Sequence, residues 1–296
     1  MERKTAADFD QELLILFDAY VHGAIDRRGF LDKAKKFAVG GMTAAMLLDQ
    51  LNPKFAEAQV IAPEDKRIRT QRVSYPSPRG SEKTSGYLVR PANAAGKLPG
   101  ILVVHENRGL NPHIEDVARR LAIENFMTFA PDALAPLGGY PGSEDEARGL
   151  FQKLDREKTA EDMLAAAQYL KGREDCTGTI GVVGFCWGGG VSHTLATRMP
   201  DLAAAVPFYG SNPEPAEAAK VKAALLVHMA ESDKRINDRW PAYAAALGEA
   251  GVSHEGHIYP GTQHGFNNDT TPRFDEAAAK LAWGRTVAFF NKHLRK

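Results

Sequence analysis

The chain has 296 residues, 44% hydrophobic and 25% charged, which is enough for one large globular domain with a core of its own. Its 37 acidic and 37 basic residues cancel, so the sequence lacks the basic footprint of a nucleic-acid-binding protein. No continuous apolar run is long enough to predict a transmembrane span.

The first sixty residues allow two interpretations. Residues 10–21 have the pattern of an amphipathic helix, and the run DRRGFLDK at 26–33 resembles a twin-arginine export signal. A modest apolar stretch over 37–51 and an A-x-A-like site that ends at Ala58 follow. Residues 1–60 are therefore either a helical arm, packed on the main domain or a second subunit, or a signal cleaved after Ala58. The long helical segment before the arginines and Asp32 inside the motif favour the arm slightly.

Residues 61–296 predict a single α/β domain. Strands are expected at 68–75, 86–89, 98–104, 126–130, 180–183, 203–209, 223–229 and 254–259. Helices are expected at 115–123, at 144–171 with one possible break, from the turn after 183 to Thr197, at 240–250 and at 277–294. This alternation predicts a mainly parallel sheet with helices on both faces. No helix separates the first two strands, so one edge of the sheet should be antiparallel.

The run GVVGFCWGGG at 181–190 predicts the catalytic element of this fold. A buried strand, a tight glycine-flanked turn and a helix are the context in which a G-x-C-x-G motif lifts one side chain above the sheet. That residue is Cys186, where most such turns carry serine, and the N-terminus of the following helix favours its thiolate. The alternative is a buried structural cysteine in a glycine-rich turn of a nucleotide-binding type. We expect Cys186 and the other cysteine, Cys176, to be reduced.

Polar residues that follow other strands complete a candidate triad. In an open α/β sheet the chemistry gathers beyond the carboxyl ends of the strands. Asp233 follows the strand at 223–229 and His264 follows the last strand, which gives the chain order nucleophile, acid, base of α/β-hydrolases. Glu231 competes with Asp233 for the role of the acid. The backbone N–H groups of two further residues are expected to form the oxyanion hole, those of Trp187 and Asn107.

Other titratable residues carry weaker signals. His105 and His228 lie at strand ends, where they could pack or act, and Asp132 is typical of a structural acid that holds its loop. A metal site from His105, Glu106, His113, Glu115 and Asp116 lacks the spacing of known motifs, so we expect no metal and no other cofactor.

The motif GFCWGG at 184–189, the loop of Asp233 and the run HGF at 264–266 resemble the dienelactone hydrolase (carboxymethylenebutenolidase) family over about 68–294. The resemblance implies an α/β-hydrolase fold, ester or lactone hydrolysis, and a glutamate that modulates the thiol, which here is Glu106. A carboxylate beside the thiol would raise its pKa and keep it protonated until substrate arrives.

The expected substrate site departs from the family pattern. Family members that cleave dienelactone hold its carboxylate with arginines, one of them four residues beyond the catalytic histidine, where this chain has Asn268. Arg108 or Arg148 could substitute for it, and Trp187 is bulkier than the aliphatic residue expected beside the nucleophile.

The sequence thus predicts a hydrolase of a small ester or lactone that works through a Cys186 thioester. The alternative is a non-catalytic α/β-hydrolase relative that binds a small ligand or a partner chain. A redox role is less favoured because no second cysteine lies close to Cys186 in the sequence. We expect a cytoplasmic protein, or a periplasmic one if the export signal operates. The apolar segment 13–21 suggests a homodimer formed through the arm.

Overall fold

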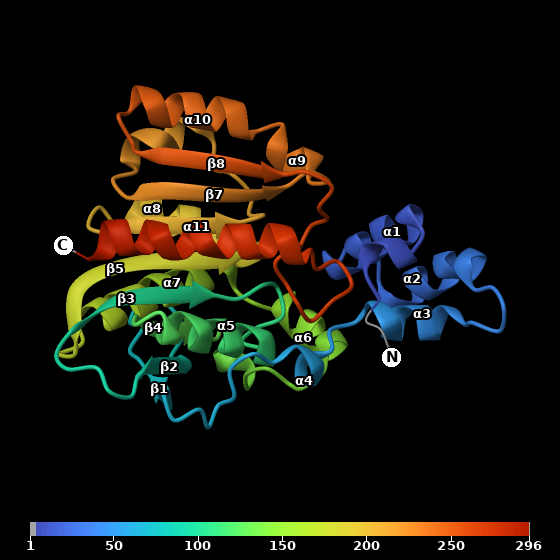
Figure 1. Cartoon of the computed structure of the whole chain (residues 1–296), viewed down its shortest axis with the longest axis horizontal. Helices are drawn as coiled ribbons and strands as arrows, with labels where there is room; N and C mark the ends of the chain where they lie inside the picture. Colours follow the sequence, from blue (N-terminus) through green and yellow to red (C-terminus); the bar gives the residue numbers. More distant parts are fainter. Residues whose placement is uncertain (1–3, 296) are drawn as a thin grey trace.

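The computed structural model describes residues 4–295 and consists of an α/β domain with a helical arm at one end (Figure 1). The strands are β1 (Ile68–Ser74), β2 (Ser85–Pro91), β3 (Leu98–Val104), β4 (Met127–Pro131), β5 (Cys176–Phe185), β6 (Ala204–Phe208), β7 (Ala224–Ala230) and β8 (His254–Tyr259). The helices of the α/β domain are α5 (Pro112–Ile123), α6 (Glu144–Phe151), α7 (Arg156–Lys171), α8 (Trp187–Arg198), α9 (Lys234–Asn237), α10 (Trp240–Glu249) and α11 (Glu276–Leu294).

The strands form one sheet in the order β1-β2-β4-β3-β5-β6-β7-β8. β1 pairs antiparallel with β2, β2 pairs antiparallel with β4, and the remaining pairs are parallel, which confirms the expected antiparallel edge. Helices α5 and α11 cover one face of the sheet, and α7, α8 and α10 cover the other. β3, β4, β6 and β7 are buried along their whole length, which explains why their sequences are apolar without alternation.

The expected long helix at 144–171 is broken once. α6 ends at Phe151, and Asp155 begins the next helix by accepting hydrogen bonds from the backbone N–H groups of Glu157 and Lys158. An N-cap of this kind satisfies donors that have no partner inside the helix. Two residues of the break, Gln152 and Leu154, line the cavity described below.

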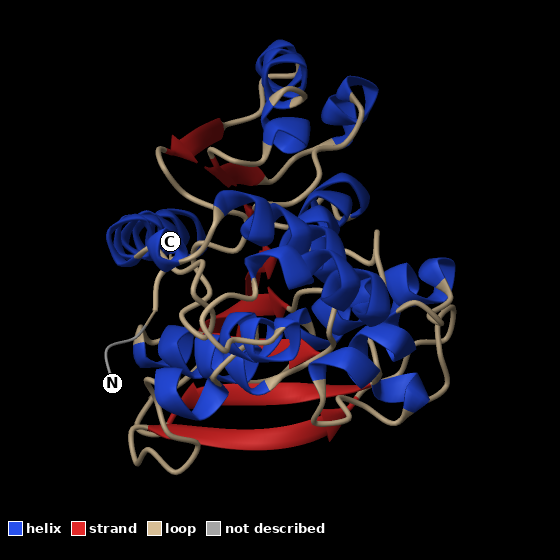
Figure 2. Ribbon diagram, turned by 90° about the vertical axis from the view of Figure 1, so that its right-hand side faces the viewer, coloured by secondary structure: helices blue, strands red, loops and turns tan. Residues whose placement is uncertain are grey.

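The arm contains α1 (Gln11–Val21), α2 (Arg27–Ala34), α3 (Ala44–Leu51) and α4 (Phe55–Ala58). It lies beyond the carboxyl ends of the parallel strands, and Figure 2 looks onto it from that side. Helices α1, α2 and α3 share a small core of their own, which contains Leu13, Leu14, Phe17, Tyr20, Phe30, Ala34, Leu47, Leu48 and Leu51. The apolar face of α1 is thus covered within the chain. This removes the reason for which a dimer was expected, and the oligomeric state stays a prediction.

The segment that joins the arm to the sheet is fastened to α5. The backbone N–H groups of Val60 and Ile61 donate to the Asp116 carboxylate at 2.9 and 2.8 Å. Arg120 donates to the carbonyl oxygen of Ala58 at 3.3 Å. The bond after Ala58, where the sequence suggested cleavage, therefore lies in a tethered segment.

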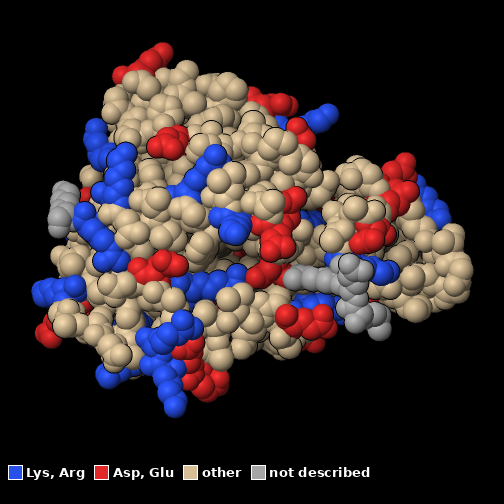
Figure 3. Space-filling model, viewed as in Figure 1, with Lys and Arg blue, Asp and Glu red and all other residues tan. Residues whose placement is uncertain are grey.

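Two further properties concern the distribution of surface charge and the apolar character of the helices. Lys, Arg, Asp and Glu side chains are intermixed over the face drawn in Figure 3, without a large patch of one sign. Within residues 4–295, no helix combines the length and the apolar character needed to cross a bilayer.

Candidate active site

The turn between β5 and α8 places Cys186 in a strained conformation. Its φ and ψ are 54° and −111°, in a region that residues with a side chain rarely adopt. The backbone folds back so tightly that a Cβ on Gly184 would lie 2.0 Å from the carbonyl oxygen of Gly188. The backbone N–H of Cys186 donates to Phe208 of β6 at 3.0 Å, which fixes the turn to the sheet. The glycines are therefore required by close packing, as the motif predicted.

The loops after β7 and β8 bring Asp233 and His264 together. His264 Nδ1 lies 2.8 Å from Asp233 Oδ2 and 3.0 Å from Oδ1. Glu231, the competing acid, instead accepts from the backbone N–H of Gly261 at 2.9 Å. The other ring nitrogen of His264, Nε2, is buried and has no hydrogen-bond partner within residues 4–295. His264 and Cys186 Sγ lie within 4.8 Å of each other through their donor atoms, so Cys186, His264 and Asp233 form one connected group.

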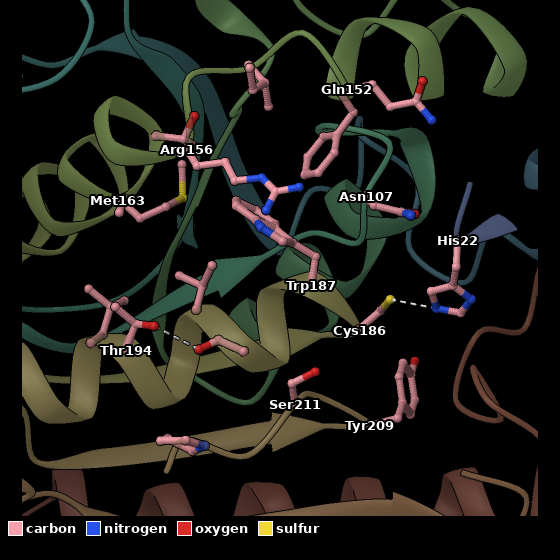
Figure 4. A pocket seen from close by; sticks show the side chains of 18 of the residues that line it. His22, Asn107, Gln152, Arg156, Met163, Cys186, Trp187, Thr194, Tyr209 and Ser211 are labelled. Atoms are coloured by element: carbon pink, nitrogen blue, oxygen red, sulfur yellow. Dashed lines mark hydrogen bonds between the residues drawn. The ribbon is translucent and has the colours of Figure 1, made fainter. Parts of the chain in front are cut away.

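A second imidazole reaches the thiol from the arm, and the sequence analysis missed it. His22 follows the last turn of α1, and its Nε2 lies 3.5 Å from Cys186 Sγ, as the dashed line in Figure 4 marks. Its ring meets that of His264 edge-on, with the centroids 4.7 Å apart. Its Nδ1 lies 2.9 Å from the carbonyl oxygen of Asp18 and 3.3 Å from the Asp18 carboxylate. Arg273 donates to that carboxylate at 3.2 Å.

The charges of this group favour a thiolate. Burial favours the neutral thiol, but the charge of His264 and the hydrogen bond from His22 outweigh it and lower the pKa of Cys186 to about 6. Burial likewise opposes protonation of His22, but its bonds to Asp18 and Cys186 raise its pKa to about 9. The pKa of His264 is raised well above its ordinary value, because Cys186 and Asp233 outweigh the effect of burial. These shifts favour a thiolate at Cys186 and a proton on each of the two imidazoles.

Glu106 lies apart from the cavity that Cys186 lines. Its Oε2 accepts a hydrogen bond from Asn268 Nδ2 at 3.2 Å, and it lines a separate small cavity with Arg108 and Arg273. A thiol held protonated by this carboxylate was expected, but the pKa of Cys186 is lowered, because imidazoles and not a carboxylate contact the sulfur.

Both arginines proposed for a substrate carboxylate bind the end of α1. Arg148 donates to the carbonyl oxygen of Tyr20 at 2.7 Å, and its guanidinium lies 3.8 Å from the centre of the Tyr20 ring. Arg108, only 5% exposed, donates to the carbonyl oxygen of Val21 at 3.1 Å. Cations are favoured at the C-terminus of a helix, where carbonyl groups lack partners. The arm thus uses the hydrogen-bonding groups that were expected to bind substrate.

A cavity of about 660 Å³ opens beside Cys186 (Figure 4). Much of its wall is apolar and comes from the end of α6, from α7 and α8, and from the break between α6 and α7. This part of the wall contains Phe151, Leu154, Met163, Leu164, Trp187, Val191 and Leu195. Trp187 stacks on His105 with the ring centres 5.2 Å apart. The hydroxyl of Tyr209 is buried beside the cavity and has no hydrogen-bond partner within the described residues. The cavity therefore has an apolar wall and a phenol near the thiol, and four arginines also line it, namely Arg148, Arg156, Arg198 and Arg235.

The remaining titratable candidates are structural. His105 Nε2 accepts from the backbone N–H of Ala133 at 3.0 Å, and both ring nitrogens of His228 are engaged within the core. Asp132 accepts from two backbone N–H groups of its own neighbourhood, as expected of an acid that holds its loop.

The residues that the sequence analysis weighed as metal ligands do not form a single group in the structure. His113 lies beside Asp269, and Asp116 is paired with two arginines of α5. Over residues 4–295, the one group of three potential donors comprises His22, Cys186 and His264. Because a carboxylate lies beside each imidazole, we interpret this group as an acid–base cluster around a nucleophile.

Comparisons with known proteins show which family the chain is similar to. The family model described as "Dienelactone hydrolase family" matches residues 84–294, and a model described as "YqhI-like" matches residues 1–39. The chain is 30% identical to the "Putative carboxymethylenebutenolidase" of Saccharolobus solfataricus over 246 residues, 71% of this chain and 94% of the relative. It is 50% identical over 114 residues to the "Putative hydrolase fragment YghX" of Escherichia coli, 38% of this chain and 97% of that one.

Solved structures give the same result for the fold. The crystal structure of a "Putative Dienelactone Hydrolase" from Klebsiella pneumoniae is similar with a TM-score of 0.67 and 30% identity, over 76% of this chain and 99% of that chain. The sheet described above is thus the α/β-hydrolase type that the sequence predicted.

Proposed function

Since the chain belongs to the dienelactone hydrolase family, we propose that it hydrolyses a small carboxylic ester or lactone through a thioester on Cys186. The observation that carries this proposal is the connected group of Cys186, His264 and Asp233 at the mouth of the cavity. A non-catalytic binding protein would have no need for a strained cysteine beside a paired imidazole, so this geometry favours catalysis.

Each step can be written with these groups. The Cys186 thiolate attacks the carbonyl carbon, and the carbonyl π electrons move to the oxygen, which the backbone N–H groups of Trp187 and Asn107 are proposed to stabilise. The intermediate collapses, the C–O bond to the alcohol breaks, and protonated His264 gives its proton to the leaving alkoxide. Neutral His264 then takes a proton from water, and the hydroxide attacks the thioester. The C–S bond breaks, which releases the acid and restores the thiolate. Asp233 holds the ring of His264 and stabilises its charge throughout.

The cavity indicates the kind of substrate. Its apolar wall favours an uncharged group in the ester or lactone. Four arginines also line the cavity, but Arg148 bonds Tyr20, Arg198 bonds Glu161, and Arg156 and Arg235 are exposed to solvent. Glu106 stays a candidate for modulating the thiol through its charge alone, since Asn268 holds it in the neighbouring cavity.

The acyl-enzyme is the direct test. Mixing the full chain with p-nitrophenyl acetate should release a burst of p-nitrophenol that matches the amount of enzyme. Mass spectrometry of the quenched protein should find one acetyl group on the peptide that contains Cys186. Prior treatment with iodoacetamide should abolish both signals. Turnover without any acetylated Cys186 peptide, or turnover that survives complete alkylation of this thiol, would contradict the mechanism.

The assignment of the acid gives a paired prediction. Asp233→Asn should lower kcat/KM by about 10²- to 10⁴-fold, because the amide holds the wrong tautomer of His264 and cannot stabilise its charge. Glu231→Gln is the matched control, since it removes a neighbouring carboxylate that bonds only a backbone N–H. It should leave kcat/KM within about threefold, because the glutamine carbonyl oxygen can still accept the hydrogen bond from the backbone N–H of Gly261. Equal losses in the two variants would contradict the assignment.

A further inference from the structure

We propose that His22 is a fourth catalytic residue, which donates a hydrogen bond from Nε2 to the Cys186 thiolate, and that the helical arm serves to hold it there. This proposal rests on the proposed function, because it assigns a role in the same reaction. It concerns a residue from a segment outside the residues 84–294 that match the hydrolase family model.

The position of His22 is set from several sides. Its ring is oriented by Asp18, one turn earlier in α1, and Arg273 of the α/β domain binds the Asp18 carboxylate. A histidine ring whose Nδ1 is held by a carboxylate presents its Nε2 in a fixed direction. That Nε2 faces the sulfur at 3.5 Å, which is within the range of a hydrogen bond to sulfur. The arrangement repeats the Asp233–His264 pair, and the two imidazole rings meet edge-on beside the thiol.

The end of α1 is anchored immediately before His22. The carbonyl oxygen of Val21 accepts from the Asn107 side chain at 3.0 Å and from Arg108 at 3.1 Å. The carbonyl oxygen of Tyr20 accepts from Arg148 at 2.7 Å. The two hydrogen bonds from arginines are charge-assisted and therefore stronger than neutral ones. Three side chains of the α/β domain therefore fix the two residues that precede His22. The position of His22 in the site is thereby fixed as well.

His22 acts by charge and takes no net part in proton transfer. In the resting enzyme its Nε2–H bonds the thiolate and opposes protonation of the sulfur. When the thioester forms, the sulfur becomes neutral and this bond weakens, while the proton stays on His22 because Asp18 faces it. When the C–S bond breaks, the sulfur regains its charge and the bond re-forms, which helps the thiolate to leave. His264 thereby stays free to exchange protons with the alkoxide and with water.

Charged and titratable groups from several elements lie around the cluster of His22, Cys186 and His264. They are Asp18 on α1, Glu106 and Arg108 after β3, Tyr209 after β6, Asp233 after β7, and His264 and Arg273 in the segment between β8 and α11. Among them, His264 is the other cation close to the sulfur, so it sets the remaining pKa shift when His22 is removed. The thiol should then stay partly activated, and its titration should move without reverting to that of a free cysteine.

The pH dependence of alkylation tests this role without any substrate. The rate of Cys186 alkylation by iodoacetamide follows the thiolate, so in the wild type it should rise through a midpoint near the pKa of about 6. Loss of the His22 charge lowers the stability of the thiolate, which raises the thiol pKa and moves the midpoint to higher pH. In His22→Gln we expect an upward shift of about one unit or more, which is an approximately tenfold lower rate below both midpoints. Asp18→Asn should shift the midpoint in the same direction by less. The readout is mass spectrometry of the Cys186 peptide, in a buffer with a chelator.

His257→Gln is the matched control. Both histidines have side chains that are 28% exposed and both lie beside a carboxylate, but His257 is on β8, away from the thiol. It should leave the midpoint unchanged. Thermal unfolding of each variant shows whether the arm and the domain still fold as in the wild type. An unchanged midpoint in a folded His22→Gln variant would overturn the proposal. If instead the wild type hydrolyses no ester, the proposed function fails, and the alkylation profile still decides whether His22 stabilises the thiolate.

Discussion

Replacement of Cys186 by alanine is expected to lower kcat/KM for p-nitrophenyl acetate by about 10⁴-fold or more. The residue supplies the atom that forms the covalent intermediate, and the loss of a nucleophile commonly removes nearly all of the catalysis that a triad provides. Steady-state kinetics with the purified variant measures the effect. Cys186→Ser should also lose most of its activity, because the site is arranged to stabilise a thiolate, and a serine hydroxyl does not ionise near pH 6 in this way.

The other cysteine provides the control. Cys176 is buried at the start of β5 and accepts a hydrogen bond from the backbone N–H of Gly178 at 3.4 Å. Burial raises the pKa of its thiol, which makes it a poor nucleophile. Cys176→Ser should therefore retain wild-type kcat/KM within about threefold, since the hydroxyl can keep this hydrogen bond. Wild-type-like turnover by Cys186→Ala would refute the thioester mechanism.

Gly184→Ala is expected to destabilise the chain strongly. The added Cβ would lie 2.0 Å from the carbonyl oxygen of Gly188 and 2.6 Å from Ser192 Oγ. The first of these is backbone at the start of α8, so the turn that carries Cys186 would have to open. Such overpacking in a buried turn lowers the free energy of unfolding by about 3 kcal/mol. Urea denaturation followed by circular dichroism measures the change.

Gly190→Ala is the control for this effect within the same glycine-rich run. A Cβ at Gly190 meets nothing within 4 Å, and the residue lies in α8. Alanine is the better helix former, so the free energy of unfolding should stay the same or rise by about 0.5–1 kcal/mol. If Gly184→Ala proved as stable as Gly190→Ala, the turn would not be as tightly packed as described.

The fold and most of the site could be predicted because their signals are local. Buried parallel strands have continuous apolar sequences, and the turn at Cys186 needs glycines on both sides whatever else the chain does. Asp233 and His264 could be placed because residues after parallel strands gather at one edge of the sheet. The break between α6 and α7 was also foreseen, although only the structure reveals its N-cap at Asp155.

What the sequence did not reveal depends on the docking of the arm. His22 follows an ordinary amphipathic helix and is 164 positions from Cys186, so no periodicity or spacing relates the two. The only local signal was its place directly after the helix. Arg108 lies in the loop after β3 and Arg148 lies in α6, and both were expected to be free for substrate. They bind α1 instead, because the unpaired carbonyl groups at its end lie within their reach.

The docking of α1 also bears on how the protein matures during translation. His22 and the preceding residues of α1 leave the ribosome before the residues that they contact. Those residues lie in 107–148, at 186 and in 264–273, and are made much later. Contacts of such large sequence separation form late, because the intervening chain must first be ordered. A nascent chain could thus form most of its sheet before His22 contacts the thiol of Cys186. In a pulse-chase experiment, the shift of iodoacetamide reactivity toward low pH should accordingly appear after protease resistance of the α/β domain.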